Sequence, residues 1–416
     1  MTATVLVLLA GLGLLLVGMG LLGTLLGVRA TMASFTNLET GLIMAGYYAG
    51  YILGTELGPR TIRRVGHIRC FAAFAALGAA LALAFGLWVS PWIWLPLRIL
   101  NGVCVVGVYM VVESWLNQQT TGPFRGRVFA TYMMSTLVAL GGGQFLLLAA
   151  PASGLELFAV AAMLVSLGLV PISVTRVTEP RIELAVPLGL RQLFRVSPLG
   201  TVGSFGSGLV NGVFWGMTPV FAQRLGLGAE DIATLMSATI FGGALLQWPV
   251  GHLSDKHDRR LVLTFVSLLT AAVALVAAWV VVRGHPGLVP VAFCYGGLMF
   301  SLYGLSVAHA NDHLEPGQVL AATRGLLLVY GLGALVGPLI GGLAMDGFGP
   351  VGLPVLSAAA LVAITLYGFY RMTRRPSPAT GEQTGFVPMV RTTPVALEMH
   401  PEADLAPELD LSRDRQ

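Results

Sequence analysis

The sequence predicts an all-α integral membrane protein, with twelve transmembrane helices in two pseudo-symmetric six-helix bundles and both termini in the cytoplasm. Three observations support this prediction: the composition, a series of long apolar runs, and a repeat within the chain. Hydrophobic residues make up 55% of the 416 positions, and the mean hydropathy is +0.79. Water-soluble domains contain roughly 45–50% apolar residues even when glycine is counted, so the composition is that of a membrane protein.

The apolar runs are long enough to cross a membrane. A helix needs about 20 residues to span a hydrocarbon layer of roughly 30 Å. Only helices and closed barrels satisfy every backbone group in lipid, and these runs lack the alternation of strands. The first run lacks the basic start and cleavage site of a secretory signal, so it is kept as a helix. The spans are expected at 3–28, 39–59, 68–90, 92–116, 126–150, 154–175, 200–223, 230–253, 260–282, 287–310, 322–345 and 349–371.

Basic residues are distributed unevenly between the two ends of these spans. If the N-terminus is cytoplasmic, seventeen Lys and Arg residues of the loops and span ends lie inside, and Arg29, Arg224 and Arg283 lie outside. Cytoplasmic loops carry an excess of basic residues. The bias therefore predicts that both termini lie in the cytoplasm.

Composition also divides the chain into four parts. We predict an N-terminal six-helix bundle at 1–175, a proline-containing cytoplasmic linker at 176–199, and a C-terminal six-helix bundle at 200–375. Residues 376–416 are rich in Pro, Thr and acidic residues. Such a composition cannot bury enough apolar surface to fold, so we expect a disordered cytoplasmic tail.

The repeat appears when the chain is compared with itself at an offset of 194 residues. The predicted spans then superpose, which favours two similar halves. Four identities coincide as well, namely Gly102 with Gly296, Tyr109 with Tyr303, Asn117 with Asn311, and Gly143 with Gly337.

The stretch GHLSDKHDRR, at 251–260, concentrates charge between two apolar runs. It has a glycine, an aspartate four residues later, and then basic residues. With RILNG at 98–102, this pattern resembles the major facilitator superfamily, and the resemblance covers the chain before the tail. The first-half counterpart departs from the family pattern, because Arg63 stands where the family has an acid. The loop residues are Gly251, Asp255, Lys256, Arg259 and Arg260.

The resemblance implies two bundles that rock around a central substrate site, which gives alternating access to the two sides of the membrane. It also implies that Asp255 approaches the start of the fifth span, beside Arg125 and Arg127, when the cytoplasmic gate is shut. A helix N-terminus favours an anion there. The neighbouring basic residues would hold the loop at the lipid headgroups.

The 322–345 span carries the pattern G-x-x-x-G-P-x-x-G-G, which is similar to one that antiporters of the family usually carry in the fifth span. The fifth span of this chain has GGGQ at 141–144 instead. Small residues let helices approach closely, and a proline permits a bend, so we interpret the pattern as a hinge, with rigid packing as the alternative. Its residues are Gly333, Gly337, Pro338, Gly341 and Gly342.

Arg98 is the first candidate for a binding residue, because an arginine within a span is costly and must face protein or water. Asn101, Tyr109 and Glu113 lie on the same face of the helix. By the resemblance, this span lines the central cavity. Arg98 is expected to bind an anionic substrate or to tune a proton carrier; alternatively, it binds carbonyl groups of the first span and braces the bundle.

Glu113 lies fifteen residues after Arg98, or about 22 Å along a helix, so the two cannot pair. We expect Glu113 to meet Arg60, Arg63 or Arg64, either as part of a gate or as a structural salt bridge. No carboxylate is predicted at the middle of the membrane. Glu113 and Glu56 are therefore the candidate acids of a proton pathway.

Six further polar or aromatic residues are candidates for the cavity wall, since binding pockets combine an apolar lining with a few polar groups. Each could instead bind a neighbouring helix. They are Gln144, Asn211, Trp215, Gln247, Tyr295 and Tyr330. His309 and His313 have a spacing that suits a metal, but we expect a solvated loop there and no metal or cofactor.

These features predict a secondary transporter of a small organic solute. The expected location is a bacterial inner membrane, because VVESWLN at 111–117 resembles a bacterial branch of the family. We expect proton coupling, and consider export. The alternatives are proton-independent uptake or exchange of an organic anion held by Arg98, and a transporter-like sensor. The phosphate-binding loop G-x-x-x-x-G-K-[ST] of ATP-driven pumps needs a lysine. The sole lysine, Lys256, stands in the sequence SDKHD, so this chain carries no such loop. The expected partners are the solute, protons and the lipid bilayer, with no nucleic acid, and the chain is expected to be a monomer.

Overall fold

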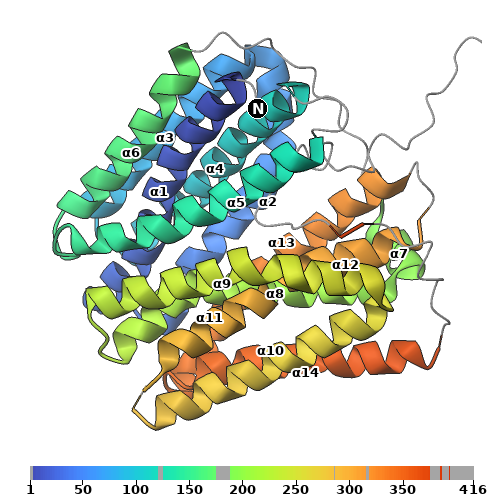
Figure 1. Ribbon diagram of the computed structural model, residues 1–416. Helices are drawn as coiled ribbons and strands as arrows, with labels where there is room; N and C mark the ends of the chain where they lie inside the picture. Colours follow the sequence, from blue (N-terminus) through green and yellow to red (C-terminus); the bar gives the residue numbers. More distant parts are fainter. Residues whose placement is uncertain are drawn as a thin grey trace, which may run out of the picture.

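A computed structural model of the protein describes residues 3–119, 125–174, 188–284, 286–314, 318–374, 385–386 and 393. Over these ranges the regular secondary structure is entirely helical (Figure 1). The all-α prediction is confirmed. The first part of the predicted linker and most of the predicted tail lie outside the described residues.

The first half of the chain forms one group of helices, drawn from blue to green in Figure 1. The predicted fifth span is an α-helix that continues as a 3₁₀ segment, η2. The helices are α1 (Ala3–Met32), α2 (Asn37–Val65), α3 (His67–Leu87), α4 (Pro91–Gln119), α5 (Arg125–Gly143), η2 (Gln144–Leu148) and α6 (Glu156–Val174).

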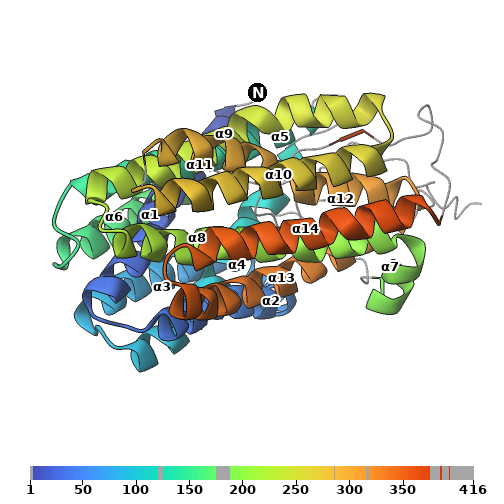
Figure 2. The ribbon, with the colours of Figure 1, turned by 90° about the horizontal axis from the view of Figure 1, so that it is seen from below.

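The second half forms the other group, which Figure 2 shows from below. A short helix, α7 (Leu190–Val196), precedes it within the predicted linker, and the predicted tenth span is broken at Phe300 into two helices. The remaining helices are α8 (Pro198–Arg224), α9 (Ala229–Lys256), α10 (Arg259–Val282), α11 (Leu288–Met299), α12 (Ser301–Asn311), α13 (Val319–Phe348) and α14 (Gly352–Met372).

Ten helical stretches of the described chain are long and apolar enough to cross a membrane. Two further helices, α2 and α8, have 29 and 27 residues but are not among the ten. The sequence of α2 includes Glu56 and three arginines, and that of α8 is rich in glycine and polar residues. The count of twelve spans therefore stays a prediction for these two helices.

Several helix starts follow from local sequence. The Thr36 hydroxyl accepts a hydrogen bond from the Glu39 backbone N–H, and the Glu39 carboxylate accepts one from the Thr36 backbone N–H, so a capping box opens α2. Ser197 caps α8 with Pro198 in its first turn. Asp258 accepts the Arg260 backbone N–H at 3.0 Å, which starts α10 directly after α9.

Glycine lets pairs of helices in each half pack backbone to backbone. A Cβ atom at Gly208 or Gly212 of α8 would collide with the carbonyl groups of Tyr330 or Ala334 in α13. In the first half, a Cβ atom at Gly50 of α2 would collide with the backbone of α4. These are the close approaches that small residues permit between membrane helices.

The two halves meet through α2 with α13, α1 with α8, and α5 with α9. The Asn37 Nδ2 atom of α2 donates to Asp346 Oδ1 of α13 at 2.8 Å. Nearby, Arg224 at the end of α8 donates to the Phe35 carbonyl at 3.1 Å. We call this end, formed by the α1–α2, α8–α9 and α13–α14 connections, the closed end. The opposite end, formed by the α2–α3, α4–α5 and α9–α10 connections, is called the basic end.

Candidate functional site

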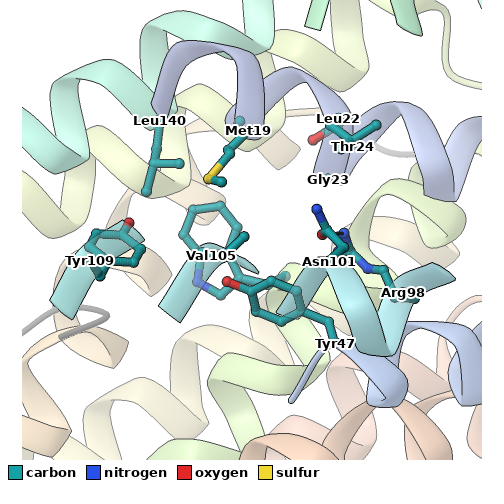
Figure 3. A pocket seen from close by; sticks show the side chains of 12 residues that line it. Met19, Leu22, Gly23, Thr24, Tyr47, Arg98, Asn101, Val105, Tyr109 and Leu140 are labelled. Atoms are coloured by element: carbon teal, nitrogen blue, oxygen red, sulfur yellow. Dashed lines mark hydrogen bonds between the residues drawn. The ribbon is translucent and has the colours of Figure 1, made fainter. Parts of the chain in front are cut away.

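A pocket lies along the polar face of α4, where the first half meets α8 of the second (Figure 3). Its volume is about 490 Å³, counted to include space open to solvent. Four helices of the first half contribute side chains, and α8 contributes one. The lining residues are Met19, Gly20, Leu22, Gly23, Thr24, Tyr47, Arg98, Asn101, Val105, Tyr109, Leu140 and Trp215.

Arg98 provides the positive charge of this pocket and is 8% exposed. Its Nη1 atom donates to Asn101 Oδ1 at 2.9 Å, one turn further along α4. The guanidinium carbon lies 4.7 Å from the centre of the Tyr47 ring of α2. A cation over an aromatic face is stabilised by the ring quadrupole, so Asn101 and Tyr47 hold the guanidinium group within the pocket wall.

Trp215 brings the second half to the same pocket. Its ring centre lies 4.9 Å from that of Phe214 and 6.1 Å from that of Phe300, both at steep angles. Phe300 stands at the break between α11 and α12. The apolar side of the pocket therefore rests on an aromatic cluster built from two helical segments of the second half.

Of the predicted cavity residues, the structure brings Arg98, Asn101, Tyr109 and Trp215 to the pocket. The others have different surroundings. Asn211 donates to the Ser207 carbonyl within α8 at 3.0 Å, and Gln247 is buried on α9. Neither residue lines this pocket, so their contact with a solute stays a prediction.

Gln144 joins α1 to the end of α5. Its amide nitrogen donates to the carbonyl groups of Gly20 at 3.1 Å and Leu140 at 2.9 Å. The hydroxyl of Thr24, which also lines the pocket, donates to its amide oxygen. Gln144 thus binds residues of the pocket wall, among them Gly20 and Thr24, without lining the pocket itself.

Glu113 is fully buried near the basic end of α4. The Tyr132 hydroxyl of α5 donates to its Oε1 atom at 2.6 Å. The expected contact with the α2 arginines is corrected here, because Arg60 instead pairs with Glu56 on an exposed turn of α2, at 3.9 Å. Glu113 faces inward from α4, whereas these arginines lie on the exposed end of α2.

The predicted gating loop is compact. Arg259 is almost fully buried, with its Nη1 atom 2.6 Å from Asp312 Oδ1 and its Nη2 atom 3.0 Å from Asp255 Oδ1. Arg260 pairs with Asp258 at 2.8 Å, while Lys256 is exposed at the end of α9. The loop is therefore tied to α12 by a buried ion pair.

The predicted hinge residues lie within α13, which is continuous through Pro338. A Cβ atom at Gly333 or Gly337 would collide with carbonyl groups of α8, and one at Gly342 would lie 2.5 Å from the Asn37 carbonyl of α2. Gly341 lies against Met217 of α8. The same stretch thus contacts both halves.

The expectation for His309 is wrong in one respect. Its side chain is not in a solvated loop but is 4% exposed within α12, with its ring 4.8 Å from that of His313. In the part of the chain that the structure describes, no three His, Cys, Asp or Glu side chains are grouped closely enough to hold a metal.

The family model of the Major Facilitator Superfamily matches residues 4–323 and 200–403. The chain belongs to the major facilitator superfamily. It is therefore a secondary transporter and a multi-pass protein of a bacterial inner membrane, as the sequence predicts.

Relatives and solved structures agree with this family assignment. The uncharacterized MFS-type transporter YcaD of Salmonella arizonae is 30% identical over 354 residues, which is 83% of this chain and 90% of the relative. The nucleoside transporter NupG has a TM-score of 0.72 at 11% identity, with 90% of this chain and all of that chain covered. A bacterial homologue of the lysosomal transporter Spinster, in an inward-facing and unoccupied conformation, has a TM-score of 0.71 at 16% identity, with 91% and 100% covered. At these identities the two structures show the fold alone.

The sequence analysis missed three residues that contact the predicted polar residues. Tyr47 lies under Arg98, Thr24 binds Gln144, and Tyr132 binds Glu113. The run YYAGY at 47–51 was the available signal for Tyr47, because aromatic residues favour cations. The other two pairings join distant segments, and no local pattern indicates them.

Proposed function

We propose that this transporter binds a small organic solute at the Arg98 pocket and moves it by alternating access. The observation that carries the proposal is the guanidinium group of Arg98, held by Asn101 and Tyr47 at the meeting point of the two halves. A charge within a membrane bundle is costly and marks a functional site by default. Rocking of the halves would expose such a pocket first on one side and then on the other.

The pocket wall supports a class of solute. Its one charged lining residue is Arg98, and Thr24, Asn101 and the tyrosines add neutral hydrogen-bonding groups. Trp215 adds a flat aromatic surface to the same lining. A small organic anion with an apolar or aromatic portion is complementary to this lining, because the guanidinium group would bind the anion and the indole would pack on the apolar part.

Substrate binding can be tested without knowing the solute in advance. We would record thermal-shift responses of the purified protein to matched sets of organic carboxylates, their neutral amides and organic cations. Carboxylates should stabilise the parent protein, and Arg98→Ala should abolish that response. The control is Arg283→Ala, which removes an arginine that lies over the Trp279 ring of α10 instead. Equal responses of the Arg98→Ala protein and its parent would contradict the proposal.

A second proposal concerns energy coupling, and Glu113 favours it. This carboxylate is fully buried, and Tyr132 donates to it at 2.6 Å. Proton-driven transporters use such intramembrane acids as proton carriers. Solute flux into proteoliposomes should then follow an imposed pH gradient, in either the import or the export direction. Flux that is indifferent to the gradient would leave proton-independent exchange of an organic anion as the mechanism.

A further inference from the structure

Two residues beyond the last helix contact the basic end of the bundle. The backbone N–H of Phe386 donates to Asp255 Oδ1 of α9 at 2.8 Å. The Phe386 ring packs against the hydrophobic core beside Gly251, where a Cβ atom would lie 2.9 Å from the ring carbon Cγ. Gly251 therefore leaves the space that the ring occupies. This contact joins the tail to the second half.

The second contact joins the tail to the first half. Thr393 is fully buried, and its backbone N–H donates to Glu113 Oε2 of α4 at 3.2 Å. Its hydroxyl also donates to Glu113 Oε2. Together with the Tyr132 hydroxyl, these donors surround the carboxylate. A tail residue thus donates hydrogen bonds to the acid that we propose as the proton carrier.

The spacing of the two contacts makes the tail a bridge. Phe386 and Thr393 are seven residues apart, so they are separated by at most about 25 Å of extended chain. One is bound to α9 and the other to α4, which belong to different halves. Closing the basic end would bring these halves together around the residues already bound between them.

We propose that the basic end is a binding surface for the transporter's own tail, with Phe386 and Thr393 as its anchors. The bound tail holds the protein in the state whose opposite end is closed, and so arrests the cycle. It also uses Asp255, the carboxylate that the family resemblance assigns to the shut cytoplasmic gate. This inference rests on the alternating access proposed above and adds a means of regulating it.

The test measures the separation of the halves in the full-length protein in lipid nanodiscs. Spin labels are attached at Ala130→Cys on α5 and Leu253→Cys on α9, both exposed positions. Cys70, Cys104 and Cys294 are replaced by alanine. The parent should show one distance population. The double variant Phe386→Ala, Thr393→Val should show a second, shorter distance. This distance should be found in at least several times as many molecules as in the parent.

A matched control is Thr373→Val, which removes an exposed hydroxyl that bonds only locally, to the Tyr370 carbonyl at the end of α14. It should reproduce the parent's distances. Thr393→Glu places a second carboxylate against Glu113 and should have the same effect as the double variant. It therefore provides the test if the double variant does not fold. Distances unchanged from the parent in both tail variants would overturn the inference.

The distance measurement needs no solute, so it is independent of the transport proposal. If solute flux is found, the tail variants should raise its rate several-fold above that of the parent and of Thr373→Val. Absence of flux in every variant, with the distance change present, would count against the transport proposal alone. Normal pH-driven flux with unchanged distances would count against the tail inference alone.

Discussion

Asn37 and Asp346 form a hydrogen bond across the two halves, with Asn37 Nδ2 lying 2.8 Å from Asp346 Oδ1. The two residues are 309 positions apart in the chain. They occupy the start of α2 and the end of α13, beside the close approach of Gly342 to the Asn37 carbonyl. The bond joins elements of different halves, so it can persist only while this end of the bundle is closed.

Removing that bond should favour opening of the closed end. A single hydrogen bond contributes roughly 0.5–1.5 kcal/mol, so Asp346→Ala should increase the open population by about twofold to tenfold. Spin labels at the exposed residues Leu38 and Phe348 would report the change as a longer distance. Glu230→Ala, which alters an exposed acid in the first turn of α9, serves as the control and should show the parent's distribution.

The aromatic ring of Tyr47 should be required for the affinity of the Arg98 pocket. Tyr47→Leu removes the ring face beneath the guanidinium group, which is worth about 0.5–2 kcal/mol. An anionic ligand identified by thermal shift should then bind roughly 2- to 30-fold more weakly. Tyr47→Phe keeps the ring and should bind nearly as well as the parent. A ligand that distinguishes Phe from Tyr as strongly as Leu from Tyr would show that the hydroxyl matters instead.

Glu113→Gln should separate solute movement from proton movement. The amide keeps the size of the side chain but cannot release a proton, so flux driven by a pH gradient should fall to the background level. Exchange of labelled for unlabelled solute at equal pH should continue. Glu56→Gln changes an exposed acid of α2 and should retain gradient-driven flux. Retained gradient-driven flux in Glu113→Gln would assign the proton to another group.

The buried pair of Arg259 and Asp312 should be important for stability. Their side chains are 1% and 2% exposed, and removing one partner of a buried pair costs about 3–5 kcal/mol. We expect Asp312→Ala to lower the midpoint of thermal unfolding, toward the smaller end of that cost because Asp255 still contacts Arg259. The double variant Arg259→Met, Asp312→Leu should recover much of the loss. If the double variant is no more stable than Asp312→Ala, apolar packing cannot replace the ion pair as a source of stability.

Packing between α8 and α13 should depend on glycine. Gly337→Ala places a methyl group against the Leu209 carbonyl of α8, and overpacking of this kind costs about 1–3 kcal/mol. Its thermal unfolding midpoint should fall. Gly13→Ala is a matched control in α1, since no atom lies within 4 Å of the added Cβ atom. Equal midpoints for the two variants would remove the close approach as a source of stability.

Much of this architecture could be predicted because a lipid environment restricts the available folds. Long apolar runs must form helices in lipid, and ten of the predicted spans correspond to helical stretches that meet the length and composition for crossing a membrane. The capping box at Thr36 and the cap at Ser197 depend on residues only three positions apart, so the sequence indicates them directly. The charge of the 251–260 loop was likewise visible in the sequence.

The sequence by itself determined the helical class, the main helices and the presence of a costly arginine on a polar face of α4. Only the tertiary structure decided the partners of the polar residues: Tyr47 for Arg98, Tyr132 and Thr393 for Glu113, and Asp312 for Arg259. The physical reason is the range of the interactions. Helix formation and capping involve residues within a few positions of one another, whereas a buried polar group takes its partner from whichever helix packs beside it.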